Sequence, residues 1–148
     1  MKAVVQRVKK ASVKVDHRMT GSIELGYMIL LGIKDNDSTE DAQYLSRKIA
    51  NLRIFEDDQG KMNKSVIDVS GSILLISQFT LYGNTSDGNR PSFTEAAKPE
   101  VAIPLYELMI DLLINQYHIP TATGIFGANM EVELVNDGPC TIIFESKK

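Results

Sequence analysis

Apolar and polar residues alternate over residues 3–15, and the alternation is interrupted once, at Lys9 and Lys10. A period of two is typical of a β-strand that is buried on one face and exposed on the other. We therefore expect one long half-buried strand with a bulge near the two lysines. A turn over residues 17–21 follows it.

Short continuous apolar runs predict the other strands. They are too short for confident helices, and glycine, proline or asparagine bounds most of them. The clearest are residues 27–33 and residues 72–81. Further strands are expected over residues 121–126, 130–135 and 141–145, with Asn136-Asp137-Gly138-Pro139 as a turn before the last of them, because Asp-Gly is a common hairpin sequence. A return to strand is also expected at Arg53-Ile54-Phe55, before a turn at Asp57-Asp58-Gln59-Gly60.

Two segments have the period of a helix. Asp37 or Ser38 is a suitable N-cap for the first, and Glu40 and Asp41 stand where the helix dipole favours acidic residues. Its inward face is expected to hold Ala42, Leu45, Ile49 and Leu52.

The second helix is expected to begin near Pro99, because proline suits the first helical turn. Pro104 lies inside the pattern and leaves a later start open. The inward face would carry Val101, Leu105, Leu108, Leu112 and Asn115.

The order of strands, helix, strands, helix and strands predicts an α+β fold. We expect one domain over residues 1–148, with a curved, mostly antiparallel, barrel-like β-sheet and two packed helices. The chain has no internal repeat and no low-complexity linker.

Composition narrows the classes of function. At 43% hydrophobic residues the chain can form a real core, and its net charge of −3 argues against non-specific coating of nucleic acid. One cysteine, Cys140, excludes an intrachain disulfide and a multi-cysteine zinc site, and the two histidines add little, so we expect no metal. No signal-like or membrane-spanning run is present, which favours a cytoplasmic protein with no membrane partner.

Three residues are candidate nucleophiles: Ser77, Thr80 and Cys140. The chain has no Gly-x-Ser-x-Gly elbow and neither phosphate-binding glycine motif. A structural role is the favoured interpretation of all three. Ser77 and Thr80 would be polar residues where a strand leaves the core, and Cys140 would be a small buried residue. The basic residues Arg7, Lys9, Lys10 and Lys14 on the first strand, and Lys61, Lys64 and Arg90 in loops, fit a solvated surface better than an RNA-binding one.

Two glycine-containing segments could form the rim of a pocket. Residues 124–130 are either a wall that approaches a ligand closely or a bulge between strands. The Gly138-Pro139 bond can be cis at a cost of roughly 0.5–1 kcal/mol, which would turn two carbonyl groups to one side, but the sequence leaves the isomer open.

Nearly the whole chain resembles the D-aminoacyl-tRNA deacylase family. The most diagnostic segments are Ser77-Gln78-Phe79-Thr80-Leu81, Arg90-Pro91-Ser92-Phe93, Thr123-Gly124-Ile125-Phe126-Gly127-Ala128-Asn129-Met130 and Asn136-Asp137-Gly138-Pro139-Cys140-Thr141. Each is weak alone, and their order makes the match specific.

The resemblance implies a homodimeric, cofactor-free, RNA-binding hydrolase of translation quality control. It would cleave the ester of D-aminoacyl-tRNA at the tRNA 3′ end, would also act on mischarged glycyl-tRNA, and would not bind DNA. The resemblance assigns catalytic positions to Ser77, Gln78, Phe79 and Thr80, and substrate-binding positions to Gly138, Pro139, Phe126, Gly127, Ala128 and Met130. The cis Gly138-Pro139 motif would cross from the partner subunit and exclude L-amino acids.

The mechanism stays open at this stage. The vicinal ribose hydroxyl of the tRNA could drive hydrolysis, which the resemblance favours, or Thr80 could be a protein nucleophile. A dimeric binding module without catalysis and an esterase for small esters are the other two hypotheses. The preferred tRNAs and D-amino acids are not readable from the sequence.

Overall fold

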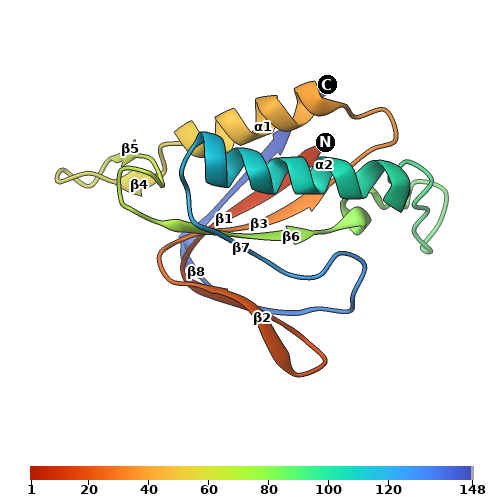
Figure 1. Ribbon diagram of the computed structural model, residues 1–148, viewed down its shortest axis with the longest axis horizontal. Coiled ribbons are helices and arrows are strands. Elements are labelled where there is room, and N and C mark those ends of the chain that lie inside the picture. Colours follow the sequence, from red (N-terminus) through yellow and green to blue (C-terminus); the bar gives the residue numbers. More distant parts are fainter. Residues whose placement is uncertain (148) are drawn as a thin grey trace.

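The computed structural model describes residues 1–147 as one domain, in which two helices cover one face of a strongly curved sheet (Figure 1). The strands are β1 (Lys2–Val15), β2 (Arg18–Ile23), β3 (Gly26–Gly32), β4 (Phe55–Glu56), β5 (Met62–Lys64), β6 (Ser72–Ser77), β7 (Thr121–Thr123) and β8 (Glu131–Glu145). The helical elements are α1 (Thr39–Asn51), the 3₁₀ helix η1 (Phe79–Tyr82), α2 (Pro99–Asp111) and the π-helical turn η2 (Leu112–Gln116).

The main sheet is mixed. Its strand order is β2-β1-β3-β6-β7, and β8 pairs with β1 along almost the full length of both strands. The pairs of β1 with β2, β3 and β8 are antiparallel, whereas β3 with β6 and β6 with β7 are parallel. Each parallel pair is joined through a helix, α1 or α2, because parallel neighbours need a long crossover connection. The predicted α+β class and the barrel-like curvature are confirmed. The parallel pairing of β3, β6 and β7 was not predicted from the sequence.

The sheet curls until β2 and β7, the first and last strands in its order, lie against each other. Gly21 on β2 permits this approach. A Cβ atom at Gly21 would lie 2.7 Å from the carbonyl oxygen of Thr123 on β7, closer than a real side chain can come. The small residue therefore allows the barrel to be nearly closed.

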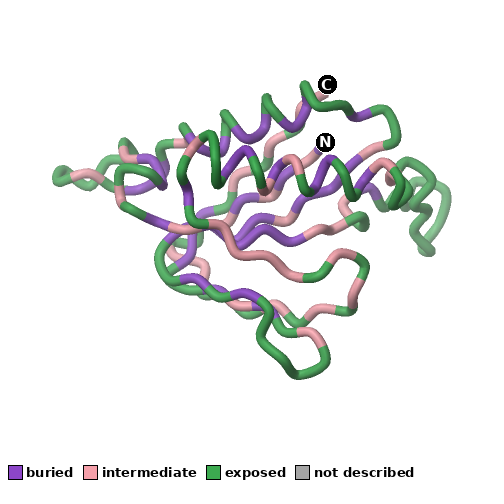
Figure 2. The backbone as a smooth tube through the Cα atoms, viewed as in Figure 1, coloured by how far each residue is buried: buried purple, intermediate pink, exposed green. Residues whose placement is uncertain are grey.

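Two hydrophobic clusters follow from this curvature, and Figure 2 shows the buried residues concentrated in the strands and on the inner faces of the helices. The larger cluster lies between the sheet and the helices, and Ile29, Leu45 and Met109 are fully buried in it. The smaller one fills the inside of the curl, with Val13, Leu74 and Ile76 at its centre. Between them the clusters fix the ends of β3 and β6.

Both predicted helices begin as expected. Ser38 is the N-cap of α1, and its backbone N–H donates to Asp41 Oδ2 over 2.8 Å. Pro99 occupies the first turn of α2, and Pro104 lies inside the helix on its exposed side without delaying the start. The bulge predicted at Lys9 and Lys10 is also confirmed, because the pairing of β1 with β8 shifts register there.

Several boundaries were wrong. The turn expected over residues 17–21 is confined to Asp16 and His17, since β2 begins at Arg18, and only Phe55 of the strand expected at Arg53-Ile54-Phe55 lies in β4. The predicted strand over residues 72–81 ends at Ser77, where the chain turns into η1, and the strand expected over residues 121–126 stops at Thr123. The expected turn Asn136-Asp137-Gly138-Pro139 is instead a bulge inside β8, which runs unbroken from Glu131 to Glu145.

The register shows the size of this bulge. Gln6 pairs with Thr141 and Val8 with Asn136, so two residue steps of β1 face five of β8. The side chain of Asn136 replaces part of the lost ladder, because its Oδ1 accepts from the Cys140 N–H over 3.0 Å and its Nδ2 donates to Thr141 Oγ1.

Among residues 1–147, no helix is both long enough and apolar enough to cross a membrane.

Candidate functional site

A cavity of about 260 Å³ opens where the parallel strands β3 and β6 end. Its walls come from the strand ends, from the start of η1, from the first turn of α2 and from the connection between β7 and β8. The lining residues are Leu31, Ile33, Ile76, Ser77, Gln78, Phe79, Ala97, Ala102, Phe126, Gly127, Ala128, Asn129, Met130 and Val132. The two cores hold these segments from both sides, so the cavity is built on rigid elements.

The turn from β6 into η1 presents backbone donors. The Gln78 N–H donates to the Leu31 carbonyl over 2.8 Å, and this hydrogen bond holds the turn against β3. The first N–H groups of a helix have no acceptor within that helix. The N–H groups of Phe79 and Thr80 therefore stand at the cavity rim as potential donors to a ligand oxygen.

The side chains of Gln78 and Thr80 are hydrogen-bonded to each other, with Gln78 Nε2 donating to Thr80 Oγ1. Thr80 is exposed and lies outside the set of residues that line the cavity, whereas Ser77 and Gln78 are half-buried and belong to it. None of the described lining residues is His, Cys, Asp, Glu or Lys. The cavity thus offers amides, one hydroxyl and backbone dipoles, and no side chain that titrates near neutral pH.

The opposite wall is the segment from Phe126 to Met130. A turn shapes it, in which the Ala128 N–H donates to the Ile125 carbonyl over 3.2 Å and Gly127 has a positive φ of 79°. The Phe126 ring packs against Tyr106 of α2, with ring centroids 6.0 Å apart. Burial raises the pKa of Tyr106, whose hydroxyl donates to the Leu75 carbonyl over 2.7 Å, so the phenol stays protonated and holds α2 on β6.

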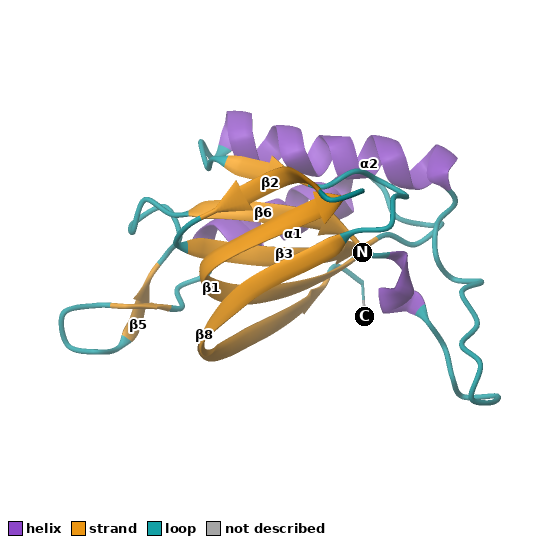
Figure 3. Ribbon diagram, turned by 90° about the horizontal axis from the view of Figure 1, so that it is seen from below, coloured by secondary structure: helices purple, strands orange, loops and turns teal. Residues whose placement is uncertain are grey.

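Gly138 and Pro139 are joined by a cis peptide bond and lie elsewhere. Both are exposed, and neither lines the cavity of its own chain. They stand on β8, which is separated from β6 by β1 and β3 (Figure 3). Three strand spacings and about four residues along the strands correspond to a separation on the order of 20 Å.

Arg7 holds this bulge from beneath. Its side chain is buried, its Nε donates to the Asp137 carbonyl over 3.0 Å, and its Nη1 donates to the Ile54 carbonyl over 2.6 Å. The sequence placed Arg7 in a row of surface cations, which is wrong for this residue. The apolar–polar alternation of β1 could have distinguished Arg7 from the exposed lysines. A period of two puts Arg7 on the same face as Ala3 and Val5, which are buried.

The structure therefore divides the predicted site residues into two groups. The first group lines one cavity and consists of Ser77, Gln78, Phe79, Phe126, Gly127, Ala128 and Met130, with Thr80 beside it. The second group is the exposed pair Gly138 and Pro139 on β8, called the rim below. The sequence did not single out the apolar residues Leu31, Ile33 and Ala102, because nothing in a strand or helix pattern distinguishes a cavity wall from a core face. Within residues 1–147 there is no group of three or more His, Cys, Asp or Glu side chains placed to hold a metal ion.

Comparison with known proteins places this architecture in a family. The sequence model of the family described as D-Tyr-tRNA(Tyr) deacylase matches residues 4–145. Two relatives named D-aminoacyl-tRNA deacylase are similar over their full length. The one from Fervidobacterium nodosum is 54% identical over 100% of this chain and 99% of its own, and the one from Halalkalibacterium halodurans is 56% identical over 99% and 100%.

Two solved structures share the fold. One, described as "c-Myc DNA Unwinding Element Binding Protein", has a TM-score of 0.94 at 43% identity and covers 100% of both chains. The other, described as "Structural Analysis of a probable eukaryotic D-amino acid tRNA deacylase", has a TM-score of 0.83 at 16% identity and covers 97% of both chains, which shows the fold alone.

The fold and the cavity define a single-domain α+β protein with a pocket of backbone donors and uncharged side chains. The chain belongs to the D-aminoacyl-tRNA deacylase family. The predicted family is confirmed, and with it the class of activity, hydrolysis of the ester bond of D-aminoacyl-tRNA.

Proposed function

We propose that the cavity at the end of β6 binds the aminoacylated 3′ end of tRNA and that the ester is hydrolysed over the turn into η1. The observation that carries this proposal is the convergence of Ser77, Gln78 and Phe79 with residues 126–130 around one cavity in a chain of this family. The catalytic role of Ser77, Gln78, Phe79 and Thr80, and substrate binding by Phe126, Gly127, Ala128 and Met130, form part of this proposal.

Positioning and charge stabilisation would provide most of the catalysis. The N–H groups of Phe79 and Thr80 would donate to the tetrahedral oxyanion formed from the ester carbonyl, and one such donor contributes about 2.7–4 kcal/mol in other hydrolases. No described lining residue could act as a general base. In this proposal the ribose hydroxyl vicinal to the ester, rather than Thr80, would orient the attacking water. It would pass the water's proton on to the ribose oxygen that leaves when the ester bond breaks.

Gly138 and Pro139 would complete the cavity from a second copy of the chain. They are exposed, and neither of them lines the cavity of its own chain. Among the described residues β8 pairs only with β1, so its outer edge is open, and it carries the exposed apolar side chains of Val135 and Ile143. A long open edge with apolar side chains is suited to association with another copy.

Chirality would be judged by exclusion. Backbone carbonyls of the cis Gly138-Pro139 unit would hold the substrate amino group and leave no volume where an L side chain must point. Glycine has no side chain to reject, so glycyl-tRNA would also be a substrate. Rejection by fixed backbone can be strong, whereas fitting one methylene in a pocket gives only about 1–3 kcal/mol.

The setting of the reaction follows from the substrate. Aminoacyl-tRNA is used in translation, so we propose a cytoplasmic enzyme of translation quality control that needs no organic cofactor. The absence of DNA binding remains a prediction, based on the net charge of −3. One structural relative is named after a DNA element, which makes duplex DNA a necessary control ligand.

The test compares three substrates: D-tyrosyl-tRNA, L-tyrosyl-tRNA and D-tyrosine ethyl ester. Hydrolysis of the D-tRNA ester alone is expected. Equal hydrolysis of the ethyl ester would identify a general esterase, since that substrate has no ribose hydroxyl. Tight binding of D-tyrosyl-tRNA without turnover would identify a binding module.

A further inference from the structure

We propose that the exposed rings of Phe79 and Phe93 form a stacking platform for an unpaired nucleobase of the tRNA 3′ end, beside the nucleoside that carries the ester. This inference rests on the proposed function, because it extends the same cavity outward along the RNA. Its occupant is a base that precedes the terminal nucleoside, and the recognition is independent of the amino acid.

The two rings meet at the cavity mouth. Their centroids lie 5.1 Å apart with an interplanar angle of 70°, an edge-to-face pair. Phe79 is 56% exposed while it also lines the cavity, and Phe93 is 36% exposed. Large aromatic rings exposed next to a binding cavity are suited to a flat ligand, and every nucleobase has a face that can stack on them.

The loop that carries Phe93 is held in place. Asn84 and Ser92 exchange two backbone hydrogen bonds of 2.8 Å across the loop, and the Ala97 N–H donates to the Ile33 carbonyl over 2.8 Å. A Cβ atom at Gly83 would lie 3.0 Å from the Phe93 ring, so the ring packs closely on the backbone that follows η1. A ring fixed in this way loses little freedom on binding.

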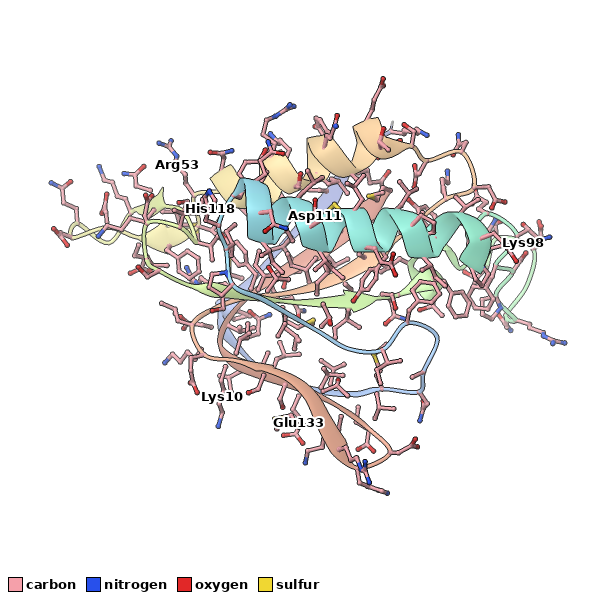
Figure 4. The ribbon with its side chains drawn as sticks, viewed as in Figure 1. Lys10, Arg53, Lys98, Asp111, His118 and Glu133 are labelled. Atoms are coloured by element: carbon pink, nitrogen blue, oxygen red, sulfur yellow. The ribbon has the colours of Figure 1, made fainter. Side chains whose placement is uncertain are left out.

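Charge near the platform suits a nucleic-acid backbone. Arg90 and Lys98 are exposed and flank Phe93 in the sequence, and neither enters an ion pair with another residue of the described chain. Figure 4 shows Lys98 at the end of α2 where the loop joins it. Glu95 is paired with Lys34 over 3.4 Å, and Asp87 and Glu100 are the other exposed acidic residues in this part of the sequence.

A single-stranded RNA end fits these features better than a protein partner does. Sequence-specific and general readers of unpaired RNA both stack bases on Phe, Tyr or Trp rings. The 3′ ends of tRNAs are unpaired, so a platform that accepts any base serves every tRNA. The terminal ester and the stacked base would then fix the RNA at two points.

The experiment uses Phe93→Leu, which keeps the apolar volume without the aromatic face, and Phe93→Tyr, which keeps the face. Each variant is assayed with D-tyrosyl-tRNA and with 3′-O-(D-tyrosyl)adenosine, a fragment without the preceding nucleotides. Phe93→Leu should lower kcat/KM on the tRNA about tenfold, mainly through KM, which corresponds to about 1.4 kcal/mol of lost stacking. Its rate on the fragment should be unchanged, and Phe93→Tyr should match the wild type on both.

Ile114→Ala is the matched control, because Ile114 is an exposed apolar residue of η2 outside the cavity lining. Equal losses on tRNA and fragment would show that Phe93 only supports the cavity, and an unchanged tRNA rate would show no stacking. Either result overturns the inference, and so would a change in solution mass for Phe93→Leu, which would assign the ring to a protein interface.

Failure of the proposed function is a separate outcome. Wild-type protein that leaves D-tyrosyl-tRNA intact would contradict the proposed function. The platform is then judged by affinity for uncharged tRNA, where weaker binding of Phe93→Leu supports it and equal binding overturns it.

Discussion

Arg7 Nε lies 3.0 Å from the carbonyl oxygen of Asp137, the residue that precedes Gly138. The same guanidinium donates to the Ile54 carbonyl, so one buried side chain joins β1, the segment before β4 and the bulge of β8. Its nearest carboxylate, that of Asp137, is 3.9 Å away. The rim that carries Gly138 and Pro139 is therefore shaped from inside the protein.

Replacing Arg7 by methionine should destabilise the protein and loosen the rim. The buried Ile54 carbonyl and the partly buried Asp137 carbonyl would lose their donor, and removing charge-assisted hydrogen bonds of this kind costs about 2–4 kcal/mol. Urea unfolding should show this loss, and discrimination between D- and L-tyrosyl-tRNA should weaken. Lys9→Met is the control, since Lys9 is exposed on the same strand. Equal stability of the two variants would contradict the assigned role.

Thr80→Ala should retain most of the activity. Thr80 Oγ1 is bonded to Gln78 Nε2 outside the cavity lining, and no described lining residue could take its proton. We expect single-turnover hydrolysis of D-tyrosyl-tRNA to slow by less than about tenfold, equivalent to less than about 1.4 kcal/mol. A fall to the uncatalysed rate would instead identify Thr80 as the nucleophile.

Gly21→Ala tests the closure of the barrel. The new methyl group would stand 2.7 Å from the Thr123 carbonyl, so β2 and β7 would have to move apart. Overpacking of this kind costs roughly 1–3 kcal/mol, and thermal unfolding should occur at a clearly lower Tm. Ser22→Ala on the same strand is exposed and should leave the Tm nearly unchanged. A Gly21→Ala protein as stable as the control would show that the contact is dispensable.

Asp41 links stability to acidity. Burial alone would raise the pKa of its carboxyl group, but hydrogen bonds from Ser146, Ser38 and Lys147 outweigh burial and lower the pKa below its usual 3.8. A lowered pKa in the folded state contributes stability that is fully present above the unfolded value and is lost as pH falls through the folded value. The contribution should therefore be complete at neutral pH and fade below about pH 4.

Asp41→Asn provides the measurement. The wild type should exceed the variant in free energy of unfolding at pH 7, and the difference should shrink as the pH is lowered from about 5 towards about 3 in denaturant titrations. Asp58→Asn, at an exposed position in the turn before β5, is the control variant. If the difference in free energy of unfolding between the wild type and Asp41→Asn did not change with pH, the contribution of Asp41 would not depend on its charge.

The sequence predicted correctly the elements whose structure depends on residues that are neighbours in the chain. The period of β1, its bulge at Lys9 and Lys10, the cap at Ser38 and the start of α2 at Pro99 all depend on neighbours in the sequence. The parallel pairing of β3 with β6 does not, because it is set by how α1 crosses the sheet.

The errors had a common cause in tertiary contacts. Asp137-Gly138 is a hairpin sequence, and it remained inside a strand because β1 continues to pair on both sides of it. Donation from Arg7 and the side chain of Asn136 stabilise the extra residues. Likewise the strand predicted over residues 72–81 ends at Ser77. The Gln78 N–H makes the last bond to β3, and the chain then turns into η1. Arg7 on β1 and Leu31 on β3 are both far in the sequence from the segments that they bond.

A mixed dimer tests most directly whether the rim acts on the other copy. One protomer carries Ala128→Trp, which fills the cavity, and its partner carries Gly138→Val, which distorts the rim; the two are purified together with different affinity tags. Each homodimer should be defective. The mixed dimer should recover about half of the wild-type D-tyrosyl-tRNA hydrolysis with full rejection of the L-ester, because an isologous pair would then contain one complete site. A mixed dimer as defective as both parents would contradict a rim donated by the partner.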